Sequence, residues 1–277
     1  MGSLREIKER IVSVRSTLKI TSAMKLVASS KLRKAQKAVE TMLPYRRALE
    51  GILFSLPSSP AFSESREGKT VIVAIASNSS LCGAFNVNAV KATLEEASKF
   101  EDAEVIAVGR KMADAMKRAG FPQAADYSSL VGKPSYEEAA DLAQSLVDRF
   151  LAGECARVEL VFNHFESASR QVPVVEKFLP VISDNSAEEE NQPFEEYIFE
   201  PEADEIAENL MPLVQKLKVY TAVLDSAAAE QAARTIAMQT ASDNAEDILS
   251  ELTLEYNKGR QQKITSEILD LVGGSAQ

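Results

Sequence analysis

The residues of this sequence that could take part in catalysis are few and lie far apart. His164 is the only histidine, and Cys82 and Cys155 are the only cysteines. A nucleophile needs a neighbouring base, and zinc sites of the usual types draw on clustered histidines and cysteines. His164 falls in a strand-like segment, where we interpret it as a packed or surface residue. The sequence therefore predicts no catalytic residue, no cofactor-binding residue and no metal ligand.

Residues 77–86, SNSSLCGAFN, form the one loop that stands where α/β proteins place ligands, after an apolar strand and before a helix. The loop holds a single glycine, and the chain contains neither a P-loop nor a dinucleotide-binding glycine motif. We interpret it as a structural turn in which Asn86 caps the next helix. A ligand-binding loop is the alternative. Cys82 has no base in evidence and is expected to be a buried small residue.

Charge is distributed unevenly, which says more than the net charge of −10. From Met1 to Arg47 there are 12 lysines and arginines against 3 acids, whereas Asp184 to Glu208 holds 11 acids and no base. The basic segment could serve a nucleic acid or a membrane surface. Because aromatic residues are missing before Tyr45 and the rest of the chain is acidic, an acidic protein partner fits better.

The N-terminal segment has a heptad pattern typical of a coiled coil. Three residues interrupt it, Thr21, Lys25 and Arg46. The apolar or small positions recur at steps of three and four from Leu4 to Leu56 and are Leu4, Ile7, Ile11, Val14, Leu18, Ala28, Leu32, Ala35, Val39, Met42, Leu49, Leu53 and Leu56.

A second heptad pattern begins after Pro212, a good first-turn residue. Nine of the 24 residues from Ala222 to Ala245 are alanine, so a partner helix can approach closely there. The pattern runs through Leu213, Leu217, Tyr220, Leu224, Ala227, Gln231, Arg234, Met238, Ala241, Ala245, Ile248 and Leu252.

Between these helices the sequence alternates apolar strand-like runs with helical segments, which is typical of a layered α/β domain. The expected strands are 71–76, 104–108, 158–165 and 172–181, and the expected helices are 87–100, 111–118 and 136–151. Two long helices at opposite chain ends bury their apolar seams most simply by pairing antiparallel. The expected fold class is therefore α/β, with a long antiparallel coiled coil of the N- and C-terminal helices plus a central Rossmann-like α/β domain.

The expected division of the chain follows from these patterns. It comprises an N-terminal coiled-coil helix (1–56), a linker (57–70), the central α/β domain (71–182), an acidic connector (183–211) and a C-terminal coiled-coil helix (212–277). No apolar run approaches the length that spans a bilayer, so direct membrane insertion is not expected.

Residues near both chain ends resemble the signatures of the F-type ATP synthase gamma subunit family. The N-terminal match is 20–36, ITSAMKLVASSKLRKAQ; the C-terminal matches are 230–234, 237–238, 242–245 and 256–268, the last being YNKGRQQKITSEI. LCGAFN at 81–86 is similar to the family's mid-chain motif. That motif commonly has two glycines and a preceding Asp-Arg pair, where this chain has Ala84 and Ser77-Asn78-Ser79.

The resemblance implies a non-catalytic central-stalk rotor subunit. Its partners would be the ring of three alpha and three beta subunits, the epsilon subunit and the c-ring, with no nucleic acid and no cofactor. Proton-driven rotation of the c-ring would be coupled through this chain to conformational changes in the catalytic beta subunits. The lack of a transit sequence and of a chloroplast-type cysteine pair favours a bacterial subunit, peripheral on the cytoplasmic face of the plasma (inner) membrane.

Carried over residue by residue, the resemblance implies contacts with the alpha-beta ring. Arg234, Gln261 and Thr265 match positions that engage a loop of a catalytic subunit. Ile264 and Ile268 would turn in an apolar collar. The region that faces the acidic C-terminal loops of the beta subunits is matched by Met24, Lys25, Lys31, Arg33 and Lys34. A coiled-coil scaffold with a ligand-binding α/β domain, and a nucleic-acid-binding arm, are the alternative functions.

Overall fold

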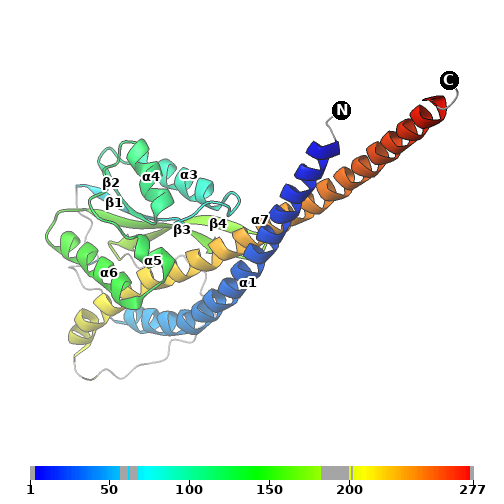
Figure 1. Ribbon diagram of the computed structural model, residues 1–277. Coiled ribbons are helices and arrows are strands. Elements are labelled where there is room, and N and C mark those ends of the chain that lie inside the picture. The colour runs from blue at the N-terminus through cyan, green and yellow to red at the C-terminus, as the bar shows by residue number, and fades with distance from the viewer. Residues whose placement is uncertain (1–3, 57–61, 63–67, 182–199, 201, 275–277) are drawn as a thin grey trace. The chain divides into compact units, whose positions relative to one another are not determined.

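The computed structural model describes residues 4–56, 62, 68–181, 200 and 202–274. The chain divides into two compact units, one made of Met1–Ser29 with Arg234–Gln277 and the other of Ser30–Ala233. Two long helices, α1 (Leu4–Phe54) and α7 (Ala203–Gly274), contribute to both units. All strands of the described chain lie in the second unit. The predicted fold class, a helical coiled coil plus a central α/β domain, is confirmed (Figure 1).

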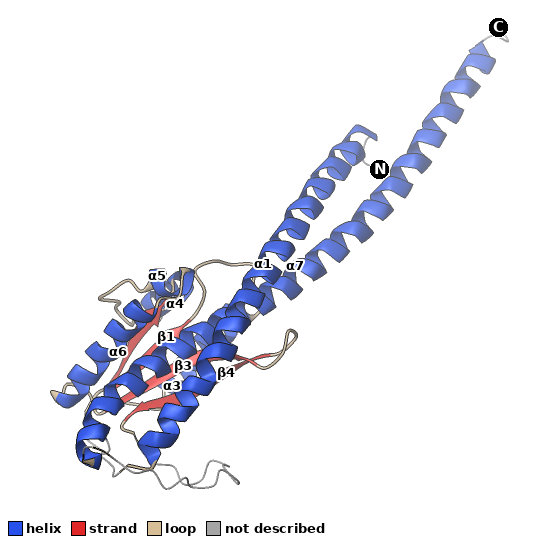
Figure 2. Ribbon diagram, turned by 90° about the horizontal axis from the view of Figure 1, so that it is seen from below, coloured by secondary structure: helices blue, strands red, loops and turns tan. Residues whose placement is uncertain are grey.

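In the first unit α1 and α7 lie side by side and run antiparallel (Figure 2). Thr21 of α1 contacts Ser242 of α7, and one turn further along α1 Lys25 contacts Gln239, which comes before Ser242 in the sequence. The two helices therefore run in opposite directions. Leu4 packs against Gly259, where an added Cβ would lie 3.0 Å from a leucine methyl carbon. The heptad positions Leu4 to Ala28 are the buried or half-buried positions of α1, which confirms its predicted seam in this unit.

The seam of α7 differs from the predicted one after Met238. Ser242, Ala245 and Leu252 are buried and Leu249 is half-buried, whereas Ile248 is 45% exposed. Ser242 is therefore a seam residue beside the half-buried Ala241, and Leu249 takes the place of Ile248. The physical reason is that Ser242 hydrogen-bonds to Thr21 of α1, and this polar contact sets which face of α7 is turned inward.

The predicted start of the C-terminal helix at residue 212 is wrong, because α7 begins at Ala203 and Pro212 lies inside it. An interior proline removes one backbone hydrogen bond and costs about 3 kcal/mol. Ala207 and Met211 are buried in the turns before it, and their burial offsets that cost. Of the expected acidic connector, residues 203–211 are thus helical, and residues 183–199 and 201 lie outside the described residues.

The second unit contains a four-stranded sheet in the order β2-β1-β3-β4. The strands are β1 (Thr70–Ile75), β2 (Ala103–Val108), β3 (Arg157–Phe165) and β4 (Gln171–Leu179). β1 is parallel to β2 and β3, and β4 returns antiparallel to β3 as a hairpin. Every residue of β1 is buried, as expected for a central strand covered on both faces.

Helices cover both faces of this sheet (Figure 1). α3 (Phe85–Ala97) and α4 (Arg110–Arg118) pack on one face over Ile72 and Ala74. On the other face α6 (Tyr136–Leu151) packs over Val71 and Val73 together with the parts of α1 and α7 that belong to this unit. The predicted strands and helices agree with these elements to within three residues at each end. The five-residue helix α5 (Ser128–Gly132) was not predicted.

Candidate partner interface

The end of α7 is a helix without a partner among the described residues. Gly259 is the position that packs against Leu4, the first described residue of α1. From Arg260 to Leu269 every side chain is exposed, including Gln261 and Thr265. Ile264 is 45% and Ile268 54% exposed. These two isoleucines lie one turn apart on one face of the helix, so the end of α7 presents an apolar stripe to whatever surrounds it.

Further apolar side chains are exposed on the outer side of the helix pair in the first unit. They are Val12, Ile20, Leu26 and Val27 of α1 and Ile236, Ile248 and Leu254 of α7. Single exposed apolar residues are common, but a series of them along a helix pair is typical of a surface that meets another protein. Sequence reasoning placed Ile248 in the seam and missed the other six, which are apolar positions outside the heptad pattern and could have been found by that signal.

Met24 and Lys25 lie on α1 beside a polar layer of the coiled coil, and both are half-buried. The Lys25 Nζ donates a hydrogen bond to Oε1 of Gln239 at 2.8 Å, and Gln239 in turn donates to Asp243 at 2.6 Å. Lys25 is therefore held within the helix pair rather than extended into solvent. The structure places its ammonium group beside Gln239 of α7, so its first partner is within this chain.

Lys31, Arg33 and Lys34 lie on one exposed turn of α1, in the second unit. Their side chains point to solvent and give this turn three positive charges close together. Exposed charges of this kind guide association and set orientation more than they add affinity. The arrangement can bind an acidic surface.

Arg234 differs from the other predicted contact residues because it is buried, with 8% of its surface exposed. Gln261, Thr265, Ile264 and Ile268 are all exposed at the far end of α7. Thr265 donates a hydrogen bond to the carbonyl of Gln261 at 2.9 Å, which keeps its hydroxyl against the helix. The structure therefore brings four of these five residues together at one helix end and leaves Arg234 inside the chain.

The loop between β1 and α3 is closed by its own hydrogen bonds. The predicted capping role of Asn86 is wrong, because α3 begins at Phe85 and Asn86 lies in its first turn. Its Oδ1 instead accepts hydrogen bonds from the backbone N–H and the hydroxyl of Ser77, at 3.0 and 2.9 Å. Cys82 is buried, as predicted. The side chains of Ser77 and Asn86 thus bind the loop itself, and that of Asn78 binds the Ser128 carbonyl and the Arg110 N–H, which supports the interpretation as a structural turn.

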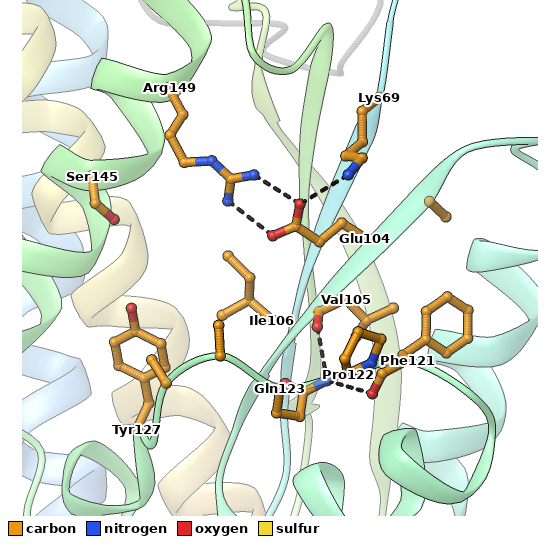
Figure 3. A pocket seen from close by; sticks show the side chains of 13 residues that line it. Lys69, Glu104, Val105, Ile106, Phe121, Pro122, Gln123, Tyr127, Ser145 and Arg149 are labelled. Atoms are coloured by element: carbon orange, nitrogen blue, oxygen red, sulfur yellow. Dashed lines mark hydrogen bonds and ion pairs between the residues drawn. The ribbon is translucent and has the colours of Figure 1, made fainter.

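A cavity of about 470 Å³ lies beside the edge strand β2 (Figure 3). Glu104 accepts two hydrogen bonds from Arg149, at 3.0 and 2.8 Å, and one from Lys69 at 3.5 Å. Arg149 and then Lys69 hold the pKa of the Glu104 carboxyl below its usual range. The amide of Gln123 donates to the Val105 carbonyl and accepts from the Ala107 N–H, so it occupies the free edge of β2. The polar groups of the cavity are therefore bound to one another.

Glu159 of β3 is a buried carboxyl that faces α3 and has Glu96 as a neighbour. Burial, followed by the negative charge of Glu96, raises the pKa of the Glu159 carboxyl. Arg157 lies 3.5 Å away and offsets part of this effect. The pair lies between helix and sheet, away from the exposed surfaces, and its effect is on stability.

Metal clusters and membrane-spanning helices would indicate other functions. Among the described residues, no three histidine, cysteine, aspartate or glutamate side chains gather closely enough to bind a metal ion. None of the helices within the described ranges combines the length and the apolar character needed to cross a bilayer.

Comparisons with known proteins place this geometry in a family. A family model described as ATP synthase matches residues 3–276. An ATP synthase gamma chain from Bacteroides thetaiotaomicron is 47% identical, with 100% of each chain covered. The chain belongs to the ATP synthase gamma chain family. The resemblance of its terminal signatures to that family is confirmed, and the relative is bacterial, as predicted.

Two solved chains of another ATP synthase share the fold. A chain of the Euglena gracilis mitochondrial ATP synthase, in a structure of OSCP, F1 and c-ring, has a TM-score of 0.69 at 20% identity, covering 99% of this chain and 94% of that one. A chain from the rotor of the same enzyme has a TM-score of 0.66 at 20% identity, covering 95% and 99%. The fold of this chain is therefore shared with both solved chains.

Proposed function

We propose that this chain is the central-stalk rotor subunit of an F-type ATP synthase, which couples proton-driven rotation of the c-ring to conformational changes in the catalytic beta subunits. The observation that carries the proposal is the unpartnered end of α7, with Ile264 and Ile268 exposed in a chain that belongs to the gamma family along its whole length. An exposed apolar helix end is costly in water unless a surrounding protein covers it. The alpha-beta ring is the partner that covers it.

The helix pair meets the physical demands on a shaft. Two helices packed along a heptad seam resist bending more than one helix does, because bending would separate the buried side chains. The shaft must also differ from one side to another. Exposed apolar side chains and an exposed basic turn, Lys31 to Lys34, give α1 different surfaces along and around its axis.

The contact residues then have distinct roles. Lys31, Arg33 and Lys34 meet the acidic C-terminal loops of the beta subunits, with Met24 and Lys25 in the same region. Gln261 and Thr265 engage a catalytic-subunit loop, while Ile264 and Ile268 turn in the collar. Arg234 is buried in the chain, so its contact with that loop requires its side chain to move outward. The epsilon subunit and the c-ring bind the chain outside the ring.

The chain has no catalytic role in this proposal, since ATP is made on the beta subunits. The complex lies at the cytoplasmic face of the bacterial inner membrane, with this chain as a peripheral subunit. The division of the chain proposed from the sequence is kept, with the helix of the C-terminal part beginning at Ala203.

The test is assembly of alpha and beta subunits with the full chain and with a chain that ends at Gln261. The full chain is expected to copurify in a ratio of one to three alpha and three beta subunits and to rotate when ATP is hydrolysed. The shortened chain lacks both collar isoleucines and is expected to assemble poorly. Normal rotation with the shortened chain would contradict the role of the helix end, and no assembly of the full chain would contradict the proposed function.

A further inference from the structure

Three polar residues of α7 form a stripe on one side of the helix within the second unit. Lys218, Thr221 and Asp225 are spaced by three and four residues, which places them on one face. Each is bonded to a different element of the chain. The stripe lies beside the apolar residues Val219, Ala222 and Val223, which pack into the core below the sheet.

Lys218 and Thr221 bind the part of the structure where β4 and α1 meet α7. The ammonium of Lys218 donates to the Lys177 carbonyl of β4 at 2.5 Å and lies 3.3 Å from Oε1 of Glu176. The same carboxylate oxygen lies 3.5 Å from a guanidinium nitrogen of Arg46. Arg46 also donates to the hydroxyl of Thr221 at 2.9 Å. Glu176 thus joins two cations, one from each long helix.

Asp225 binds the far end of the β3–β4 hairpin. One carboxylate oxygen accepts the backbone N–H of Phe165 at 2.9 Å, and the other lies 2.6 Å from Nδ1 of His164. The next turns of α7 pack Ala229 and Ala233 against Phe165. The hairpin therefore grips α7 at both of its ends, through Lys218 near Lys177 and through Asp225 near Phe165.

We propose that this polar latch (Arg46, Glu176, Lys218, Thr221, Asp225 and His164) transmits torque between α7 and the α/β domain, so that the domain and the helix turn as one body. The inference rests on the proposed rotor function. Its physical basis is that hydrogen bonds depend on their angle. Apolar contacts have no preferred bond angle, so they resist small turns of a helix about its axis less sharply than hydrogen bonds do. Hydrogen bonds weaken steeply when their angle changes, and they fix the rotation of the helix.

The latch is also arranged so that its parts depend on one another. Arg46, Lys218 and Glu176 are all less than one third exposed. If Glu176 loses its charge, Lys218 loses its ion pair and Arg46 keeps only its pair with Glu50 of α1, so the ion pairs that join α1 and α7 to β4 are lost. If Asp225 loses its charge, the Phe165 N–H keeps a weaker acceptor.

The experiment measures torsional stiffness in the assembled ATP synthase. The alpha-beta ring is fixed to a surface and halted with bound nucleotide, and a probe is attached to the α/β domain through Lys133→Cys, an exposed position. The double variant Glu176→Gln and Asp225→Asn is compared with the unchanged chain. We expect the angular variance of the probe to rise roughly twofold, because two of the three directional contacts of the stripe are weakened.

The matched control is Glu95→Gln, which removes an exposed ion pair with Lys91 in the same unit and should leave the variance unchanged. Glu176→Asp keeps the charge and should restore most of the stiffness, which a general loss of folding would not allow. If the double variant has the variance of the control in a complex that assembles and rotates, the latch is refuted while the rotor function stands. If the unchanged chain neither assembles nor rotates, the proposed function itself fails.

Discussion

The hydroxyls of Ser242 on α7 and Thr21 on α1 lie 2.8 Å apart and share a hydrogen bond. The Thr21 hydroxyl also lies 3.1 Å from the Leu18 carbonyl. Both hydroxyls are buried in the seam between the helices. A buried polar pair in a coiled coil specifies the register, since any shift of one helix along the other breaks the hydrogen bond between them.

The first prediction concerns this pair. Thr21→Val leaves the buried Ser242 hydroxyl with only the Ser22 hydroxyl, at 3.5 Å, and should lower the free energy of unfolding by about 1 to 2 kcal/mol. Combining Thr21→Val with Ser242→Ala removes both groups and should recover most of that loss. Urea unfolding followed by helical circular dichroism measures each step. Ser16→Ala, which removes an exposed hydroxyl from α1, is the control. Additive losses in the double variant would contradict the coupling.

The second prediction concerns pH and Glu159. A carboxyl whose pKa is raised by folding binds its proton more tightly in the folded chain. Its stabilising contribution is complete below the unfolded-state pKa and is lost as the pH rises through the folded-state pKa. Glu159→Gln has no ionisable group at this position, so its stability has no such loss. At pH 8 its free energy of unfolding should be about 1 kcal/mol higher than that of the unchanged chain. The difference should shrink as the pH falls toward 4.

The measurement for Glu159 is a series of denaturant unfolding curves from pH 4 to pH 8. Glu166→Gln changes a largely exposed carboxyl of the same sheet region and serves as the control. A gain in stability that is equal at every pH would show that the effect of Glu159→Gln comes from packing and not from its charge.

The third prediction concerns Gln123 and the edge of the sheet. Its side chain makes three hydrogen bonds, two of them to the outward-facing groups of β2 and one to the Phe121 carbonyl. Gln123→Ala uncovers these groups, so we expect a loss of about 1 to 2 kcal/mol in unfolding free energy. An uncovered edge also pairs with other chains, so self-association should increase in sedimentation experiments. Gln144→Ala, on the exposed side of α6, should do neither.

The fourth prediction concerns the end of α7. Ile264→Ser and Ile268→Ser change exposed side chains. Each should therefore alter the free energy of unfolding of the isolated chain by no more than about 0.5 kcal/mol, with a correspondingly small shift in its thermal midpoint. Binding to the alpha-beta ring should weaken severalfold, because apolar area is covered on assembly. The readout is the fraction of chain recovered with the ring. Asn257→Ser, an exposed polar position of α7, is the control. Unchanged recovery of both isoleucine variants would contradict the collar.

Local patterns of the sequence determined which elements form. The heptad positions of α1 and the apolar run of β1 lie on the buried faces that were predicted, because helix and strand periods are written into neighbouring residues. The family signatures near both ends likewise sit in continuous segments. The order of residues along those segments is therefore enough to indicate the family and to single out the residues at the end of α7.

Only the tertiary structure decided how those elements meet. In the seam of α7, Leu249 takes the place of Ile248 and Ser242 is buried, where its hydrogen-bond partner is Thr21, more than 200 residues away. In the sequence, Arg46 interrupts the heptad pattern. In the structure, its guanidinium contacts Glu176 of β4 and donates a hydrogen bond to Thr221 of α7. Arg234 was expected to contact a catalytic-subunit loop, and its side chain is buried within the chain. Such outcomes depend on contacts between distant residues, and a periodic pattern carries no information about which distant partner a polar side chain will find.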